Sequence, residues 1–287
     1  MTMRKLLLLF ILTFLPLVAS AQVEINGIYY YLNNETHTAE VKGKWLDKYS
    51  GDVIIPGSVS YEGIQYIVTS IGNNAFEDCE QLSSVVIPNS VITVGYSAFS
   101  GCTGLTTVYV GNNLLSVDFG AFEDCTSLTS VHISDLAAWC NISFNWSSSN
   151  PLYYARHLYM NGEEIKDLII PNGVTTIGNY VFENCSEFTS VTIPKTVTSI
   201  GSKAFDGCNG LNSVRISDLA SWCNITFDSN PLNNAHHLFI NDKEINNLII
   251  PNGITSVTNN AFAGCEGLTS LTIPDDVTSI GSTLVSR

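Results

Sequence analysis

The sequence predicts an α/β repeat fold: a solenoid of 23-residue coils with short strands, preceded by a β cap and interrupted by two duplicated helix-plus-hairpin insertions. Three observations predict this fold. One motif recurs at a fixed interval, each copy alternates apolar and polar residues as a short strand does, and one longer segment occurs twice. Repeats of about 20 to 45 residues that contact only their neighbours are typical of solenoids.

The first 21 residues are expected to be a signal peptide. Arg4 and Lys5 precede an apolar run over 6–18, and residues 19–21 (ASA) have the small-x-small pattern of a signal-peptidase site. The run is shorter than the ~18 apolar residues of a membrane span, and no later stretch approaches that length. The sequence therefore predicts a secreted or cell-surface protein without a transmembrane segment, with the periplasm as a third possible location.

The chain is strongly acidic once this segment is removed. Without Arg4 and Lys5, the 12 basic residues become 10, against 26 acidic ones, so the net charge is −16. Nucleic acids and anionic membranes both require a positive protein surface. The charge therefore argues against either of them as a partner.

Residues 22–66 lack the repeat and are expected to form the β cap. The segments GIYYYLN, TAEVKGK and GDVIIP have the composition of short strands, and YEGIQYIV is typical of a hairpin that turns at Glu62-Gly63. An uncovered solenoid end would expose the apolar side chains of its core, and such a cap would shield them from water.

Residues 67–287 carry the repeat. Its clearest unit is IPKTVTSIGSKAFDGCNGLNSVRI, residues 193–216, and further versions begin at positions 87, 110, 170 and 250. The L-x-x-V-x-I motif predicts a short strand with two inward side chains around one exposed residue, and the proline after it ends the strand because proline has no ladder donor. The A-F-x-x-C segment turns the chain back, and its aromatic rings are expected to stack inside: Phe76, Phe99, Phe122, Phe182, Phe205 and Phe262.

Two segments, about 134–168 and 217–248, are expected to be insertions between coils. SDLAAWCNISF in the first returns as SDLASWCNITF in the second. Each predicts a short helix capped by a serine, Ser134 or Ser217. Each then predicts a turn at N-P-L and a hairpin, at Asn161-Gly162 or at Asn241-Asp242.

The I-P-x-x-V-T-S-I-G-x-x-A-F-x-x-C-x-x-L frame resembles the BspA-like leucine-rich repeats of surface and secreted proteins from host-associated bacteria. The resemblance covers nearly all of the chain after the signal peptide. It implies a right-handed leucine-rich-repeat solenoid that serves adhesion and protein binding, and it implies no catalytic residues. A protein ligand is the expected partner, with a host extracellular matrix protein among the candidates.

A cysteine nucleophile with a histidine base is the enzymatic alternative. It would pair Cys140 with His157 and Cys223 with His237, but no third orienting group is recognisable and the cysteine-to-histidine spacing differs between the two copies. Structural zinc needs about four converging ligands, and each insertion offers one cysteine and one or two histidines. We therefore expect a structural role for these residues, with no catalytic, metal or cofactor site.

The eight cysteines are expected to be buried free thiols. Six of them occupy the same position of the repeat, where a small apolar side chain must fit. Neighbouring coils bring such positions within about 4.8 Å, which would permit disulfides. However, three stacked thiols leave one unpaired, and a core of this size needs no disulfides.

The candidate binding residues lie between the inward side chains of each strand. Solenoids bind through equivalent positions of successive coils, and this exposed column varies: Val86, Tyr109, His132, Thr192, Arg215 and Thr272. We single out Tyr109, His132, Thr192 and Arg215, although these are equally compatible with ordinary solvated strand residues. The sequence thus predicts a binding protein that recognises a host or bacterial protein. The alternative is a glycan-binding module that uses Trp146, Tyr153 and Tyr154.

Overall fold

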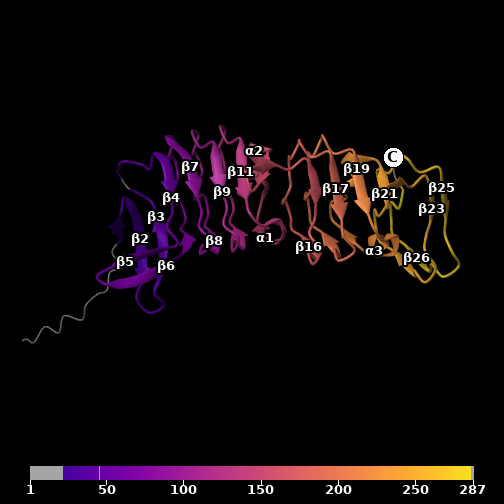
Figure 1. Cartoon of the computed structure of the whole chain (residues 1–287), viewed down its shortest axis with the longest axis horizontal. Coiled ribbons are helices and arrows are strands. Elements are labelled where there is room, and N and C mark those ends of the chain that lie inside the picture. The colour runs from indigo at the N-terminus through magenta and orange to yellow at the C-terminus, as the bar shows by residue number, and fades with distance from the viewer. Residues whose placement is uncertain (1–21, 45, 286–287) are drawn as a thin grey trace, which may run out of the picture.

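The computed structural model describes residues 22–44 and 46–285, and the signal peptide expected at 1–21 lies outside this range. The chain winds into an elongated stack whose strands lie side by side along the long axis (Figure 1). Regular coils contribute one strand to a long-strand face and a two-residue strand to a short-strand face. In the part of the chain that the structure describes, no helix has the length and apolarity to cross a membrane.

The first described strands form an antiparallel meander. β1 (Val23–Ile25), β2 (Ile28–Asn33) and β3 (Thr38–Lys42) pair in order, and β5 (Ser58–Tyr61) forms a hairpin with β6 (Ile64–Ile71). This hairpin turns at Glu62 and Gly63, which both have positive φ, so the predicted turn is confirmed. Because β3 and β6 are parallel neighbours, the meander continues the short-strand face.

The long-strand face contains the L-x-x-V-x-I motifs as parallel strands. Its first sheet consists of β4 (Gly51–Ile54), β7 (Leu82–Val86), β9 (Thr107–Tyr109), β11 (Ser130–Ile133), β13 (Leu158–Met160) and the antiparallel β14 (Glu163–Glu164). The second sheet consists of β15 (Asp167–Ile169), β17 (Ser190–Ile193), β19 (Ser213–Ile216), β21 (Leu238–Ile240) and the antiparallel β22 (Lys243–Glu244). The third contains β23 (Asn247–Ile249) and β25 (Ser270–Thr272).

The short-strand face arises from the V-T-S-I part of the repeat, where the sequence analysis expected no strand. β6 is followed there by β8 (Thr93–Val94), β10 (Ser116–Val117) and β12 (Ser143–Phe144). The later strands are β16 (Thr176–Ile177), β18 (Ser199–Ile200), β20 (Thr226–Phe227), β24 (Ser256–Val257) and β26 (Ser279–Ile280). Two residues are too few for period-two alternation to stand out in a sequence.

The two segments expected to be insertions are instead coils of the stack. The first passes through α1 (Leu136–Cys140), β12, the 3₁₀ helix η1 (Ser147–Ser149) and α2 (Leu152–Ala155) before it returns as β13. The second passes through α3 (Leu219–Cys223), β20, α4 (Leu232–Ala235) and β21. In register, Leu158 lies opposite Val131 and Leu238 opposite Val214, so each segment takes the place of a regular coil. The hairpins β13–β14 and β21–β22 are additional to these coils.

The helix start differs from the expected one by a residue. The Asp135 carboxylate, not Ser134, caps α1 and accepts the Ala138 N–H at 3.0 Å. Asp218 caps α3 in the same way, with the Ser221 N–H at 2.6 Å. Serine and aspartate are both good cap residues, so two in succession leave the boundary open.

The antiparallel strands β14 and β22 divide the stack into three blocks. The first block runs from β7 to β14, the second from β15 to β22, and the third begins at β23. Val85, Leu168 and Leu248 hold the same position in the first strand of each block. The structure therefore repeats at two levels: the 23-residue coil, and the block of several coils that ends in an antiparallel strand.

One hydrophobic core runs through all the coils. The rings of Phe76, Phe99 and Phe122 stack with centroids 4.9 Å apart at each step, and Phe182 and Phe205 are 5.4 Å apart. The predicted phenylalanine ladder is therefore confirmed within these coils.

The cysteines lie beside the ladder. All eight are buried, as predicted, and unpaired. The Cys102 thiol donates to the Phe76 carbonyl at 3.0 Å, and Cys125 makes the same bond to Phe99 at 3.2 Å. The repeat thus places a small side chain there that also satisfies a carbonyl of the preceding coil.

Candidate functional site

Two of the four candidate residues meet on the long-strand face of the first block. Tyr109 on β9 and His132 on β11 are register partners, and their rings stack with centroids 4.6 Å apart. Tyr159 on β13 extends this stack at 4.7 Å from His132. The sequence pattern did not indicate Tyr159, because the segment that carries it was expected to be an insertion outside the strand column.

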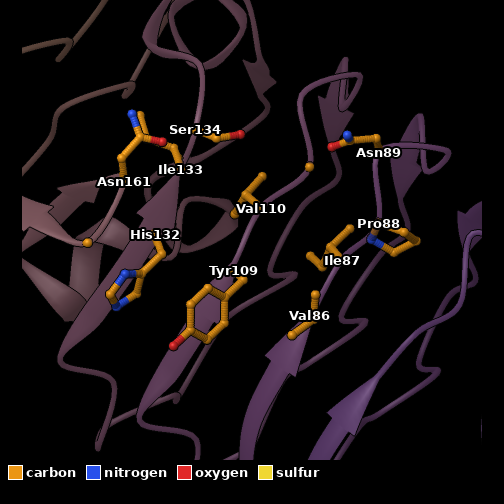
Figure 2. Close-up of a pocket in the computed structure, with 12 residues that line it drawn as sticks. Val86, Ile87, Pro88, Asn89, Tyr109, Val110, His132, Ile133, Ser134 and Asn161 are labelled. Atoms are coloured by element: carbon orange, nitrogen blue, oxygen red, sulfur yellow. The ribbon is translucent and has the colours of Figure 1, made fainter.

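A groove opens beside this stack, where β7, β9 and β11 end. Its volume is about 560 Å³, and Tyr109 and His132 line it together with Val86, Ile87 and Asn161 (Figure 2). Burial lowers the pKa of His132, so its ring is neutral near pH 7. The groove is consequently uncharged and largely apolar in an otherwise acidic chain, and an apolar lining with a few polar groups is typical of binding sites.

Thr192 and Arg215 lie in the second block, apart from the first pair. The β14 strand and β15 separate them from β13. The Arg215 guanidinium pairs with Asp242 at 2.8 Å and lies over the Phe239 ring, 5.1 Å from its centroid. The structure thus gathers the four candidates into two pairs on successive sheets rather than into one site.

The aromatic residues of the alternative site lie in one coil of the first block but differ in exposure. Trp146 is 52% exposed, whereas Tyr153 and Tyr154 are half-buried and pack edge to face at 5.1 Å. The Tyr154 hydroxyl accepts the Asp124 N–H at 3.0 Å, which gives this ring a structural role. Of the three, Trp146 alone offers a largely exposed side chain.

The Cys140 and His157 side chains do not form a nucleophile–base pair. Cys140 ends α1 and lies fully buried beside the short-strand face, and burial raises the pKa of its thiol to about 12. His157 lies at the start of β13, where Nδ1 contacts Glu164 Oε1 at 2.5 Å. Burial likewise raises the pKa of Cys223 to about 11. A reactive cysteine requires a lowered pKa and some exposure.

Within the described residues, one group of three side chains could approach a cation: His157, Glu164 and Glu187, with ligand atoms within 4.8 Å of one another. The hairpin of the second block repeats the histidine–glutamate contact, His237 to Glu244 at 2.6 Å, but the coil after it has Gly267 in place of Glu187. The contact persists without the third carboxylate, so it serves as a link across the hairpin strands.

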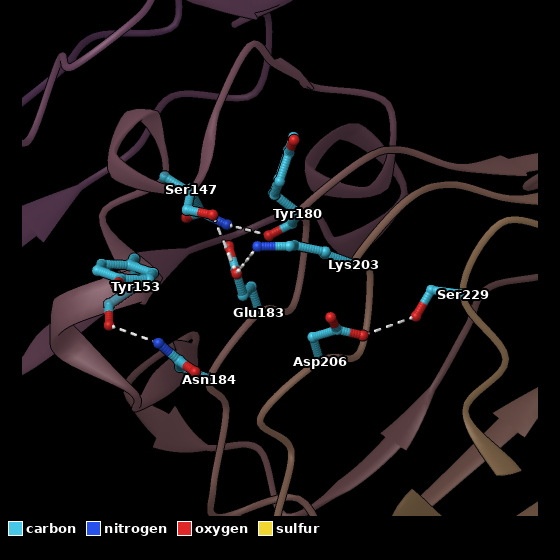
Figure 3. A network of polar contacts seen from close by, with 9 residues as sticks. Ser147, Tyr153, Tyr180, Glu183, Asn184, Lys203, Asp206 and Ser229 are labelled. Atoms are coloured by element: carbon cyan, nitrogen blue, oxygen red, sulfur yellow. Dashed lines mark hydrogen bonds and ion pairs between the residues drawn. The ribbon is translucent and has the colours of Figure 1, made fainter. Parts of the chain in front are cut away.

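A buried carboxylate lies at the junction between the first two blocks. Glu183 accepts the Ser147 hydroxyl at 3.0 Å and lies 3.8 Å from the Lys203 ammonium (Figure 3). Its second oxygen has no hydrogen-bond partner, and burial raises its pKa. The Asn150 amide also crosses this junction and donates to the Tyr180 carbonyl at 2.6 Å.

Comparison with known families agrees with this architecture. Residues 58–150 and 154–283 match the BspA type leucine-rich repeat region, in six copies. The chain belongs to this family. Search of the curated proteins gives no match. The matched ranges therefore include both the regular coils and the two coils that contain short helices, since the first range spans α1 and the second spans α3 and both hairpins.

Similar solved structures come from several bacteria. A leucine-rich cell surface protein of Faecalibacterium prausnitzii is 22% identical, with 92% of this chain and 73% of that chain covered and a TM-score of 0.45. A Bacteroides ovatus leucine-rich repeat protein is 23% identical, with 91% and 79% covered and a TM-score of 0.45. The T. pallidum leucine-rich repeat protein is 22% identical, with 92% and 87% covered and a TM-score of 0.38.

Proposed function

We propose that this chain is an exported, non-enzymatic binding protein that recognises a protein ligand through the long-strand face of its first block. Membership of the BspA-type family supports a surface or protein-interaction role. The signal-peptide pattern of residues 1–21 supports export. A host or bacterial surface protein, such as a component of the extracellular matrix, fits a binding protein in that location.

The observation that carries the proposal is the groove beside the Tyr109–His132–Tyr159 stack. Tyr109 is 42% exposed while its neighbours in the coil are buried. The rings of the stack cover each other's faces at 4.6 and 4.7 Å, so they present edges and a hydroxyl to the ligand. Such an arrangement suits the mixed apolar and polar surface of a protein, because tyrosine supplies large contact area with a polar tip.

The test is capture of host extracellular proteins by immobilised chain, followed by binding measurements on the protein recovered. The double variant Tyr109→Ala/His132→Ala should weaken its binding at least tenfold, because truncation of an interface anchor costs about 2 kcal/mol or more. The melting temperature should change little, since Tyr109 is exposed and His132 lies half-buried on the strand face outside the core.

Arg215→Ala is the matched control for the extent of the site. Arg215 occupies the place in the second block that His132 occupies in the first. If the ligand covers the first block alone, this variant binds normally; if it spans both, Arg215→Ala also weakens binding. Full binding by the double variant would contradict the proposal.

A further inference from the structure

A row of exposed aromatic side chains runs along one edge of the first block. Tyr96, Phe119 and Trp146 are 47%, 43% and 52% exposed. Their ring centroids are 6.1 Å apart at each step, and Tyr180 continues the series 6.3 Å from Trp146. We call Tyr96, Phe119 and Trp146 the aromatic row; Tyr180 is half-buried and belongs to the second block. The rings of the row are more widely spaced than the 4.9 Å of the buried phenylalanine ladder, so they leave more of their surface open.

The fold does not require aromatic residues at this position of the coil. The column begins with Asn73, whose Oδ1 accepts the Tyr96 N–H at 2.9 Å. The same bond, 2.8 Å long, links two further pairs of coils: Ser202 to Asn179 and Ser282 to Asn259. The structural preference here is thus for an asparagine that binds the next coil.

At this position the first block has the aromatic residues Tyr96 and Phe119, where the second and third blocks have asparagine and serine. In the second block, Asn179 takes the place of Tyr96 and Ser202 takes the place of Phe119. Without an asparagine before it, the Phe119 N–H is bound by Asp118 Oδ1 at 2.9 Å. The second block is shorter at the next coil and has no counterpart of Trp146. The same scaffold therefore folds without the row, and contiguous exposed aromatic surface of this kind marks an interaction site.

A polar groove of about 360 Å³ adjoins the row on the short-strand face. Side chains that can donate or accept hydrogen bonds line it: Glu40, Ser70, Asn73, Thr93, Ser116, Asp118 and Asn145. Phe119 and Trp146 directly follow Asp118 and Asn145 in the chain, so aromatic rings and polar groups alternate at this edge. The Asn145 amide donates to Asp118 Oδ1 at 2.8 Å, which fixes both side chains.

This combination matches the chemistry of a sugar chain. A pyranose ring has an apolar face of C–H groups, which pack against the negative face of an aromatic ring, and an edge of hydroxyls, which bond to amides and carboxylates. The chain's net charge of −14 disfavours acidic polysaccharides. We propose that the aromatic row and the polar groove form a binding site for a neutral oligosaccharide, separate from the protein-binding face.

The two surfaces differ in how their rings are presented. In the Tyr109–His132–Tyr159 stack, spacings of 4.6 and 4.7 Å cover the inner ring faces. In the aromatic row, Phe119 and Trp146 are tilted by 41° and lie 6.1 Å apart, so ring surface remains available for stacking. The oligosaccharide site therefore does not depend on the proposed protein ligand.

The experiment is calorimetric titration of the chain with hexasaccharides of glucose (β-1,4 and β-1,3), mannose, xylose and N-acetylglucosamine. At least one should bind with saturation. Phe119→Ser/Trp146→Ser, which gives the row the polar character of the second block, should lower that affinity at least tenfold. Phe119→Tyr should retain it. The melting temperatures of the variants show whether they remain folded.

Tyr109→Ala/His132→Ala serves as the control, and it should bind the hexasaccharide normally while losing the protein ligand. A heparin hexasaccharide tests the charge argument and should not bind. The proposal is overturned if none of the neutral hexasaccharides binds at millimolar concentration, or if binding survives in Phe119→Ser/Trp146→Ser. It is also overturned if the row instead mediates self-association, seen in sedimentation as an oligomer that the double variant lacks.

Discussion

Single residues at the coil junctions combine burial with specific hydrogen bonds. Glu183 is buried with one oxygen unpartnered, and burial raises its pKa. The folded chain therefore holds this proton more tightly than the unfolded chain does. Glu183 therefore lowers the free energy of unfolding as the pH rises above the ordinary pKa of a carboxyl group, because the ionised form must then be buried.

Glu183→Gln is expected to raise stability on the order of 1 kcal/mol at pH 7, because the amide removes a buried charge. The gain should disappear near pH 4, where the carboxyl is protonated in the folded chain. Denaturant unfolding at the two pH values measures this. Glu123→Gln is the matched control, since Glu123 occupies the same place of another coil and is exposed. A loss of stability at pH 7 would show that the contact with Lys203 outweighs the burial.

The thiols should react slowly in the folded chain. Burial raises the pKa of Cys125 and Cys208 to about 12, so little thiolate forms at pH 8. Titration with a thiol reagent should find few reactive groups in the native state and about eight after unfolding. An intrachain disulfide found in protein alkylated under native conditions would contradict the expectation of free thiols.

At the scale of elements, the Trp-Cys-Asn segments connect successive blocks through hydrogen bonds. Where the short-strand face is interrupted, between β12 and β16, the Trp139 indole N–H donates to the Val181 carbonyl at 3.1 Å. Trp222 makes the equivalent bond to Ala261 at 2.8 Å. Each helix thus carries a tryptophan that replaces a missing ladder bond between two blocks. This explains why the segment occurs twice.

The helix that presents Trp222 should depend on its cap. Asp218→Ala removes the acceptor for the Ser221 N–H and is expected to cost about 1 kcal/mol. Asp218→Asn keeps an acceptor at the same place and should cost much less. Urea unfolding of the two variants tests this pair. Equal losses would mean that the charge of Asp218, rather than its hydrogen bond, stabilises α3.

At the scale of the whole molecule, stability passes from coil to coil. Each coil contacts its neighbours alone, so the strength of the junctions decides whether the stack unfolds as one unit. The junction between the first two blocks lacks a strand pair between β14 and β15, and side chains such as Trp139 and Asn150 bridge it. It is therefore one of two expected points of separation, the other being the junction between β22 and β23, which also lacks a strand pair.

Trp139→Phe should weaken the coupling of the first block to the second, because it removes one of the two side-chain donors to the Val181 carbonyl and leaves only the Asn150 amide at 3.2 Å. We expect a broader denaturant transition with a lower m-value, and hydrogen exchange that differs between the two blocks. Trp146→Phe, a change of an exposed tryptophan, should leave both measurements unaltered. A single sharp transition in Trp139→Phe would show that the remaining contacts keep the blocks coupled.

Much of this architecture could be predicted from the sequence, because a 23-residue period repeats both the strand and the phenylalanine position. The coils that contain α1 and α3 could not be recognised, since N-I-S-F and N-I-T-F stand there in place of the V-T-S-I motif that marks the other coils, and a helix precedes them. For the same reason Tyr159 was missed as the neighbour of His132. The aromatic row was also missed: Tyr96, Phe119 and Trp146 follow three different residues, and only the coil geometry brings them into line.

The block period bears on how such a chain can change length. Because Asp167 and Asn247 open the second and third blocks at equivalent positions, DNA recombination between their codons would delete or duplicate one complete block. The product would keep every strand in register, since the new junction copies an existing one. The solenoid that such a gene encodes can become longer or shorter by one whole block at a time, while the surface residues of each block change independently of those of the others.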